Sequence, residues 1–277
     1  MSGAIIEVRH LSKTFSFEAG FFARGERTVY AVNDVSFSIQ RGSTYGLVGE
    51  SGCGKTTTAR LLVGMYSPTS GEIRYAPEAG KARNIASYTK NEMRAYREKV
   101  KYIFQDPARS LNPRMNVFEI MTSPLRYSSE WRGKDDAKER AVKIIKEVGM
   151  SEADLFRRPS EFSGGQRQAL TLLMAVMSRP ALLLLDEHTA ALDPSNAALV
   201  MNLTKRFAES YNLTVMMVTH NMQHALDYGN RLIMMDKGEI IFDIAGDEKK
   251  NLTMDDIVQR FRSIKKKALT SDRMILQ

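Results

Sequence analysis

Short apolar runs and alternating apolar positions place strands near both ends of the chain. Residues 5–8 and 35–39 alternate apolar and polar side chains, as strands with one buried face do. We expect further strands at 44–48, which is short and apolar, and at 100–104, whereas the runs at 182–186 and 214–218 are typical of buried strands. Because a helical stretch separates the last two runs, we expect a parallel sheet.

Helical periodicity replaces this pattern in the middle of the chain. We expect helices at 56–65, 117–127 (with Pro124 as a candidate kink), 134–148, 164–178 and 194–210. Residues 16–28 form an insertion that contains Gly, Arg and Phe and predict a loop. Near the end, Lys237-Gly238 joins two apolar segments, 231–236 and 239–243, and predicts a hairpin.

Since strands resume after the helical block, the pattern predicts one α/β domain with two lobes rather than two consecutive domains. We expect this domain over residues 1–250, with a core at 1–107 and 179–250 and a helical subdomain at about 108–178. Thr253 and Asp256 have capping-box spacing ahead of apolar positions, which predicts an amphipathic helix at 253–267. This helix belongs to a C-terminal helix and tail over 251–277.

Composition narrows the function classes. The chain has 277 residues, 43% of them hydrophobic, which is ample for a buried core. No apolar run approaches the roughly 20 residues of a membrane span, and no signal peptide is expected. The single cysteine, Cys53, excludes an internal disulfide and fits a reducing compartment; it is either a redox switch or, as we favour, a small packing residue.

The formal charge of +8 is compatible with nucleic acid, with acidic lipid headgroups, or with solubility alone. The basic residues are mostly scattered, and they lack the interleaved aromatic residues that single-stranded nucleic acid binding uses. We therefore expect no nucleic acid, and favour a membrane surface or a membrane partner.

A glycine-rich segment, Gly49-Glu50-Ser51-Gly52-Cys53-Gly54-Lys55-Thr56, lies between a predicted strand and a predicted helix, the context that a phosphate-binding P-loop requires. Its glycines let backbone N–H groups approach phosphates at the positive end of the helix. We expect Lys55 to neutralise the β- and γ-phosphates of ATP and the Thr56 hydroxyl to bind Mg²⁺. An ordinary glycine-rich turn is the alternative, which the flanking elements disfavour.

The apolar strand at 182–186 ends in Asp186 and is followed by Glu187, as in a Walker B segment. Such a strand would deliver Asp186 to the Mg²⁺ shell and point Glu187 at the water that attacks the γ-phosphate. Taken alone, two solvated acids after a core strand explain the pattern equally well. The P-loop upstream favours the catalytic interpretation.

Ser163-Gly164-Gly165-Gln166 resembles the signature of ATP-binding cassette (ABC) ATPases, and with it the resemblance extends over nearly the whole chain. The resemblance implies an α/β P-loop NTPase fold with a RecA-like core, an N-terminal antiparallel β subdomain and an inserted α-helical subdomain. It also implies a dimer, because in this family the signature of one chain closes the nucleotide site of another.

Further site residues are implied by the same resemblance. Gln105 matches the Q-loop glutamine, Asp193 the D-loop, His220 the H-loop histidine and Phe15 the aromatic residue that stacks on adenine. The implied catalytic residues are Glu187, His220, Gln105 and Lys55, and the implied Mg²⁺ ligands are Thr56, Gln105 and Asp186. The implied ATP-binding set is Phe15, Gly49, Glu50, Ser51, Gly52, Cys53, Gly54, Lys55, Thr56, Thr57, Ser163, Gly164, Gly165, Gln166 and Asp193. His188 stands where the family usually has proline.

Two parts of the chain resemble different importers. Residues 102–107 and 110–114 are similar to ATPases of oligopeptide and dipeptide importers, whereas residues 168–173, 186–194 and 229–235 are similar to importer ATPases assigned to amino-acid-like substrates. We expect a peptide or amino-acid-type importer, with a slight preference for the former.

The resemblance implies an ATP-hydrolysing subunit at the cytoplasmic face of a membrane. Its implied partners are transmembrane permease subunits, a second identical or related ATPase chain, and an extracytoplasmic solute-binding protein. The alternatives are a soluble non-transport ABC ATPase, an exporter subunit, and a non-catalytic regulatory module. Intact Glu187 and His220 oppose the last of these.

Overall fold

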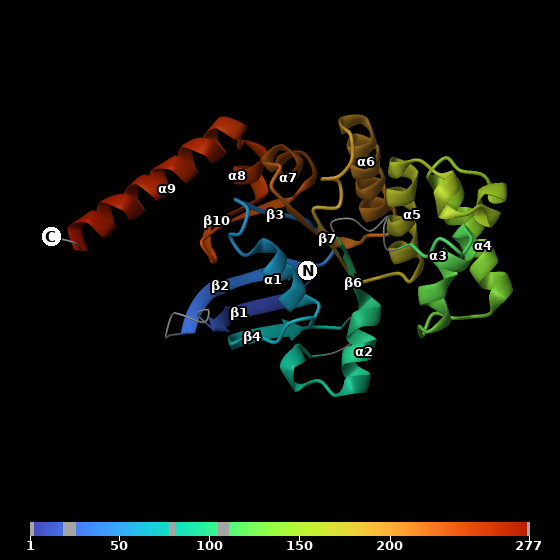
Figure 1. Cartoon of the computed structure of the whole chain (residues 1–277), viewed down its shortest axis with the longest axis horizontal. Helices are drawn as coiled ribbons and strands as arrows, with labels where there is room; N and C mark the ends of the chain where they lie inside the picture. The colour runs from blue at the N-terminus through green and yellow to red at the C-terminus, as the bar shows by residue number, and fades with distance from the viewer. Residues whose placement is uncertain (1–2, 19–25, 78–80, 105–110, 276–277) are drawn as a thin grey trace.

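Two β-sheets form the body of the protein (Figure 1). The structure is a computed structural model that describes residues 3–18, 26–77, 81–104 and 111–275. One sheet is antiparallel, with the strand order β2-β1-β4-β5. Its strands are β1 (Ala4–Glu18), β2 (Glu26–Gln40), β4 (Ser70–Tyr75) and β5 (Arg83–Asn84).

The second sheet is mostly parallel and has the strand order β10-β9-β3-β8-β7-β6. Only β10 runs antiparallel to its neighbour among these strands, which confirms both the parallel sheet and the hairpin at residues 231–243. Its strands are β3 (Thr44–Gly49), β6 (Val100–Ile103), β7 (Leu182–Asp186), β8 (Thr214–Thr219), β9 (Arg231–Asp236) and β10 (Glu239–Ala245).

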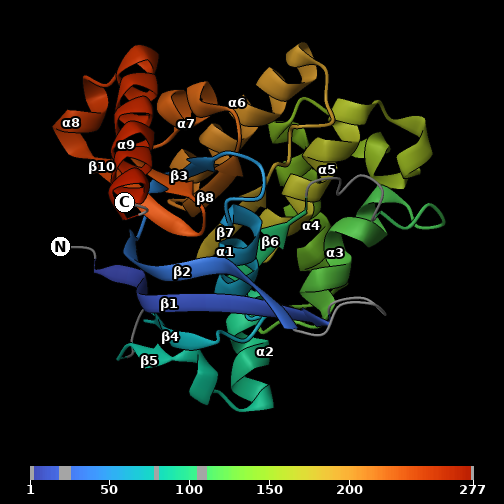
Figure 2. The same ribbon diagram turned by 60° about the vertical axis from the view of Figure 1, so that its left-hand side comes forward.

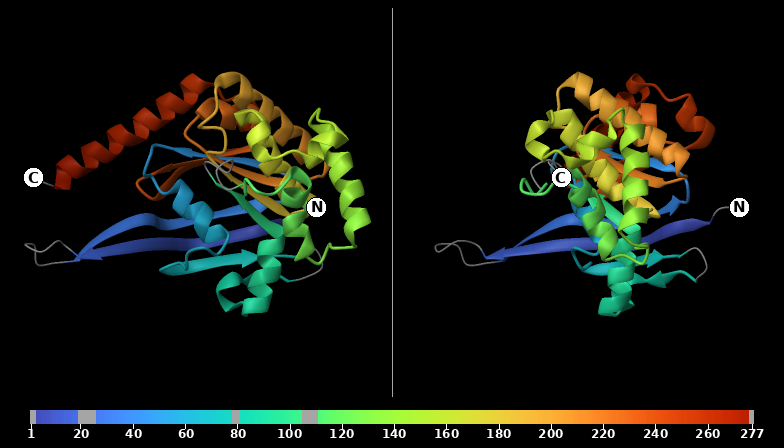
Figure 3. Two further views of the ribbon diagram at one scale, coloured as in Figure 1. Left: turned by 45° about the vertical axis from the view of Figure 1, so that its right-hand side comes forward. Right: turned by 90° about the vertical axis from the view of Figure 1, so that its right-hand side faces the viewer.

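The helices fall into two groups. The group beside the sheets comprises α1 (Lys55–Leu62), α2 (Lys90–Lys99), α6 (Pro194–Ser210), α7 (Met222–Tyr228) and α8 (Gly246–Lys250). A separate block at one end consists of α3 (Val117–Arg126), α4 (Lys134–Glu147) and α5 (Gly164–Met177), as Figures 1 and 2 show. The last helix, α9 (Met254–Ile275), projects from the body (Figure 3). None of the helices in the described residues combines the length and apolarity that a membrane crossing requires.

The parallel sheet separates two hydrophobic clusters, and the alternation of side chains along its strands explains this division. In β7, Leu183 and Leu185 belong to the cluster that includes α3, α4 and α5. Leu182 and Leu184 belong to the cluster on the other face, with α1 and the antiparallel sheet. Both faces of β7 are therefore covered, which is why its sequence is a continuous apolar run.

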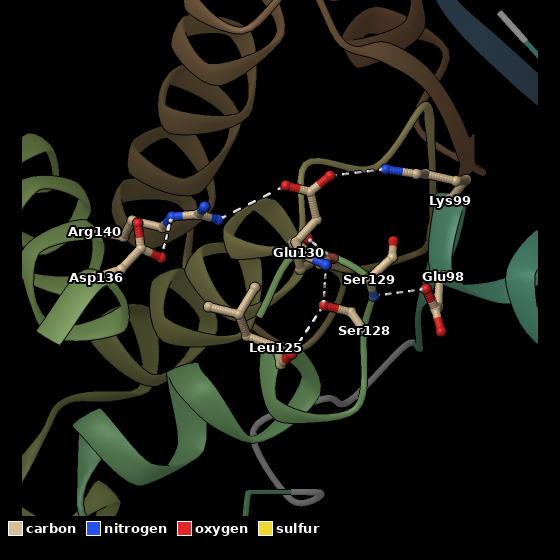
Figure 4. Close-up of polar contacts among 10 residues, drawn as sticks. Glu98, Lys99, Leu125, Ser128, Ser129, Glu130, Asp136 and Arg140 are labelled. Atoms are coloured by element: carbon tan, nitrogen blue, oxygen red, sulfur yellow. Dashed lines mark hydrogen bonds and ion pairs between the residues drawn. The ribbon is translucent and has the colours of Figure 1, made fainter. Parts of the chain in front are cut away.

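A polar cluster joins the helical block to the end of α2 (Figure 4). The Glu130 carboxylate lies between Lys99 Nζ at 3.3 Å and Arg140 Nη1 at 3.9 Å. Beside it, the Ser129 N–H donates to Glu98 Oε2 at 3.2 Å. These contacts hold the segment between α3 and α4 against the residues that lead into β6.

The predicted fold class is confirmed, but three local predictions are wrong or incomplete. Residues 16–28 are not simply a loop, because β1 continues to Glu18 and β2 begins at Glu26, with Ser16 paired to Thr28. Residues 26–28 are all polar and carry no alternating pattern of their own, so these strand ends form through pairing with each other rather than through a local signal. Helix α2 was not predicted, and α9 extends beyond residue 267. The division at residues 107, 178 and 250 stays a prediction.

Candidate active site

The P-loop connects the end of β3 to the start of α1. Gly49 and Gly54 have φ angles of 151° and 105°, a region that favours glycine. A Cβ on either residue would lie 2.2 Å from a backbone carbonyl oxygen, that of Met235 or Ala31 respectively. The loop borders a concavity that is lined by Ala31, Ser51, Gly52, Gly54, Lys55, Thr56, Thr57 and Glu187.

Lys55 is buried in this loop, with 4% of its surface exposed. Its Nζ donates to the carbonyl oxygens of Gly49 at 2.9 Å and Glu50 at 2.8 Å, and lies 3.7 Å from Cys53 Sγ. The ammonium group is thus held beside the concavity, where it suits an anionic phosphate. Burial raises the pKa of the Cys53 thiol, which favours a packing role over a redox switch.

Asp186 lies at the carboxyl end of β7, and both of its carboxylate oxygens accept hydrogen bonds. The Thr56 hydroxyl donates to Oδ1 at 3.0 Å, and the Tyr102 hydroxyl donates to Oδ2 at 2.5 Å. Burial and the contact with Asp186 raise the pKa of Tyr102 above its usual range, so its hydroxyl stays a donor. Strand β7 and helix α1 therefore bring together two residues that are 130 positions apart.

These oxygen donors fit Mg²⁺. This ion prefers hydroxyl, carboxylate, water and phosphate oxygens, and is usually held by only one or two carboxylates plus the substrate phosphates. Thr56 and Asp186 supply that set next to the P-loop. Within the described residues, no group of three or more His, Cys, Asp or Glu side chains could hold a metal ion.

Glu187 and His220 meet at the ends of neighbouring strands. His220 Nδ1 lies 3.3 Å from Glu187 Oε1, and the Glu187 N–H donates to the Val218 carbonyl oxygen at 2.8 Å. The φ angle of Glu187 is 47°, a left-handed conformation that is uncommon for a non-glycine residue and concentrates at functional sites. Glu187 lines the same concavity as Lys55 and Thr56.

His188 follows directly and is buried. Its carbonyl oxygen accepts a hydrogen bond from Gln168 Nε2 at 2.5 Å. Burial, together with the nearby His224, lowers the pKa of His188 to about 4. Its ring is therefore neutral near pH 7, and within the described structure Nε2 has no hydrogen-bond partner.

The signature segment starts helix α5. Ser163 is its N-cap: Oγ accepts from the Gln166 N–H at 3.3 Å, and Gln166 Oε1 accepts from the Ser163 N–H at 2.9 Å. Gly165 packs against Asn196 so closely that a Cβ on Gly165 would lie 2.1 Å from Asn196 Oδ1. The signature is thus fitted to the start of α6.

Asp193 caps α6 in turn. It accepts hydrogen bonds from Ser195 Oγ at 2.6 Å and from the Asn196 N–H at 3.0 Å, which hold the pKa of Asp193 well below its usual range. Neither Ser163 nor Asp193 is among the described residues that line the P-loop concavity. One chain therefore brings the P-loop, Asp186, Glu187 and His220 together. Its signature segment and Asp193 form a second group, apart from the first.

Phe15 lies in β1, opposite Val29 of β2. Its ring packs edge-on against Tyr66 at 5.6 Å between centroids. Two residues after Val29, the Ala31 carbonyl packs against Gly54 of the P-loop, so the strand pairing places Phe15 near the loop. Gln105, predicted as a catalytic residue and a Mg²⁺ ligand, lies outside the described residues.

Sequence reasoning missed Tyr102 and Ala31. Ala31 enters the site through its backbone, which no side-chain motif reveals. Tyr102 is paired with Leu184 in the β6–β7 ladder and therefore shares a face with Asp186. Only this register identifies Tyr102, and the sequence alone offers no signal for it.

Comparisons with known proteins identify the family of the chain. The family model described as ABC transporter matches residues 32–190. The probable peptide ABC transporter ATP-binding protein y4tS of Sinorhizobium fredii is 39% identical, over 87% of this chain and 67% of its own length. The tyrosine transport ATP-binding protein of Clostridioides difficile is 33% identical, over 93% of this chain and 98% of its own length.

Solved structures give the same picture. The ATP-binding cassette MJ0796, in a dimeric post-hydrolysis state bound to ADP and Pi, superposes with a TM-score of 0.71 and 27% identity over 87% of this chain and 98% of that one. The cbiO1 structure from Clostridium perfringens has a TM-score of 0.75 at 22% identity, over 93% of this chain and 94% of that one, and supports the fold. The chain thus belongs to the ABC transporter family, as an ATP-binding subunit of the kind that hydrolyses ATP to power transport.

Proposed function

We propose that two copies of this chain, or one copy and a related ATPase, close around two molecules of Mg·ATP and so drive an importer for peptides or amino-acid-like substrates. The observation that supports this proposal best is the separation of the site into two halves. Lys55, Thr56 and Glu187 line one concavity, and Asp186 is hydrogen-bonded to Thr56 beside it, whereas Ser163 caps helix α5 and is not among the described residues of that lining. A second chain would complete the site.

Each residue of the first half has a role. Backbone N–H groups of residues 49–57 and the Lys55 ammonium bind the phosphates. Thr56 and Asp186, with Gln105, hold Mg²⁺, which when bound supplies positive charge to the β- and γ-phosphates. Glu187 orients the attacking water and accepts its proton at the carboxylate, and His220 positions that carboxylate from 3.3 Å. Phe15 stacks on the adenine.

The second half acts on the nucleotide of the partner chain. The N-terminus of α5, with Ser163, Gly164, Gly165 and Gln166, offers backbone N–H groups and a partial positive charge to the γ-phosphate. Asp193 caps α6 and thereby holds the loop before this helix, which would run along the interface between the two chains. Hydrolysis removes the γ-phosphate that holds the two surfaces together, and the dimer reopens.

A transmembrane permease is the partner that would use this opening. An apolar groove between β6, α3 and α5 is lined by Lys101, Tyr102, Ile103, Phe104, Pro124, Thr171, Met174 and Ala175. Phe104 is 46% exposed there, and it directly precedes the Q-loop position. We assign this groove to the permease, which would place the chain at the cytoplasmic face of the membrane, with an extracytoplasmic solute-binding protein in the same system. Names of relatives such as oligopeptide, dipeptide and tyrosine transport proteins support the cargo class.

Complementation between two inactive variants tests the two-chain site. Lys55→Ala removes the ammonium group that binds the phosphates, and Ser163→Arg blocks the signature surface. Each variant alone should therefore have no ATPase activity. An equal mixture should regain activity, because each mixed dimer has one site with an intact P-loop and an intact facing signature. If the mixture stays inactive, nucleotide crosslinking to Ser163 of the partner chain provides the second measurement; absence of that crosslink contradicts the proposal.

A further inference from the structure

Tyr102 is the one residue in the described part of the site that makes a direct contact with Asp186 and that no motif assigns. Its hydroxyl donates to Asp186 Oδ2 at 2.5 Å, opposite the Thr56 hydroxyl, which donates to Oδ1 at 3.0 Å. Asp186 is 4% exposed, and a buried carboxylate depends on such partners. The two hydroxyls together fix the rotation of the carboxylate group.

The strand register explains how Tyr102 reaches this position. In the parallel ladder, Tyr102 of β6 is paired with Leu184 of β7. Side chains two residues apart point to the same face of a strand, so Leu184 and Asp186 share the face of Tyr102. The long phenol side chain then extends along β7 to the carboxylate of Asp186.

Tyr102 is itself held from two sides. Its ring packs edge-on against Phe104 at 4.8 Å between centroids. On the other side, the Arg60 guanidinium interacts with the Tyr102 hydroxyl and donates from Nη1 to Tyr66 OH at 3.1 Å. The phenol therefore has partners at its ring as well as at its hydroxyl.

Helix α1 contacts this arrangement at two successive turns. Thr56 and Arg60 are four residues apart and lie on one face of the helix. The first contacts Asp186, and the second contacts Tyr102. As a result, the P-loop helix and the Walker B strand are joined through both the carboxylate and its supporting phenol.

We propose that Tyr102 is a positioning residue that holds Asp186 in the orientation required to bind Mg²⁺ with the nucleotide. This inference rests on the proposed function, since it concerns the metal that the same site would hold. It predicts that the Tyr102 hydroxyl sets the Mg²⁺ requirement of nucleotide binding and leaves metal-free nucleotide binding unchanged.

Equilibrium binding of a fluorescent ADP analogue, titrated with Mg²⁺ and repeated in EDTA, tests this without any hydrolysis. Tyr102→Phe removes the hydroxyl but keeps the ring contact with Phe104. We expect the Mg²⁺ concentration for half-maximal enhancement of binding to rise about 10- to 100-fold, which lies within the range expected for the loss of one hydrogen bond to a charged group. Affinity in EDTA should stay within about twofold of the unmodified protein.

Tyr211→Phe is the matched control, because the Tyr211 hydroxyl also donates to a carboxylate, Glu147 Oε1 at 2.8 Å, far from the P-loop in the sequence and outside its concavity. This variant should titrate like the unmodified protein. An unchanged Mg²⁺ requirement in Tyr102→Phe overturns the inference, and so does an equal loss of affinity with and without Mg²⁺, which indicates a structural role. If the unmodified protein binds no nucleotide, the proposed function itself fails.

Discussion

The contact between Gly165 and Asn196 gives a stability prediction that can be worked from distances. A Cβ on Gly165 would lie 2.1 Å from Asn196 Oδ1, 2.6 Å from its Cγ and 3.0 Å from its Cβ. The Asn196 side chain cannot simply turn away, since its Nδ2 donates to Asp193 Oδ2 at 2.6 Å. Gly165→Ala gains about 0.5–1 kcal/mol from helix propensity and loses about 1–3 kcal/mol to overpacking. We expect a net destabilisation of about 0.5–2 kcal/mol.

A double-mutant cycle with Asn196→Ala separates the clash from other effects. Asn196→Ala alone should cost little, because Asp193 keeps its bonds to Ser195 Oγ and the residue 196 N–H. In the double variant the two nearest atoms, Asn196 Oδ1 and Cγ, are gone and only the Cβ of residue 196 remains close, at 3.0 Å, so most of the loss caused by Gly165→Ala should disappear. Urea unfolding of the nucleotide-free variants measures each free energy. Effects that add within about 0.5 kcal/mol would refute the steric explanation.

Three further predictions concern other parts of the molecule. Burial, with a smaller effect of His224, lowers the pKa of His188 to about 4, below about 6.5 in the unfolded chain. The stability that the neutral ring provides is therefore complete above about pH 6.5, and about 3 kcal/mol is lost as the pH falls from 6.5 to 4. In His188→Gln, the free energy of unfolding measured in urea should lose most of its pH dependence between these values, and an unchanged pH dependence contradicts the assignment. Glu130→Gln removes the acid between two cations of the polar cluster (Figure 4) and should cost about 1 kcal/mol at low salt and less at about 1 M NaCl; an equal loss at both salt concentrations would show that charge is not the cause. Phe15→Leu should weaken ATP binding about 3- to 10-fold through lost stacking, whereas Phe15→Tyr should retain it in the same fluorescence titration.

The hydrophobic periodicity and the spacing of the motifs predicted most of the buried core. The buried strands β3, β7 and β8 are mostly apolar, so their burial and a parallel sheet could be predicted from the sequence, but the order of the strands could not. Helix α2 was missed because only Tyr96 of its ten residues is buried, and a mostly exposed helix has little apolar period to detect. The strand ends at residues 16–18 and 26–28 were missed for a different reason. Their pairing depends on the partner strand rather than on local composition.

The site shows the same division. Lys55, Thr56, Asp186 and Glu187 were identifiable because their roles depend on positions next to a loop or a strand end. Tyr102 depends on the register between β6 and β7, which a single sequence does not specify.

The dimer-closing site is tested most directly by the mass of the Glu187→Gln variant with Mg·ATP. This change keeps the shape of the side chain and removes the base, so bound ATP should persist. Light scattering should show the 31.2 kDa chain doubling in mass with Mg·ATP, and returning to a monomer with Mg·ADP or when Ser163→Arg is added. A variant that binds Mg·ATP but stays monomeric would contradict the closure of one chain's site by the signature of another, and one that turns over ATP at the normal rate would contradict the role of Glu187.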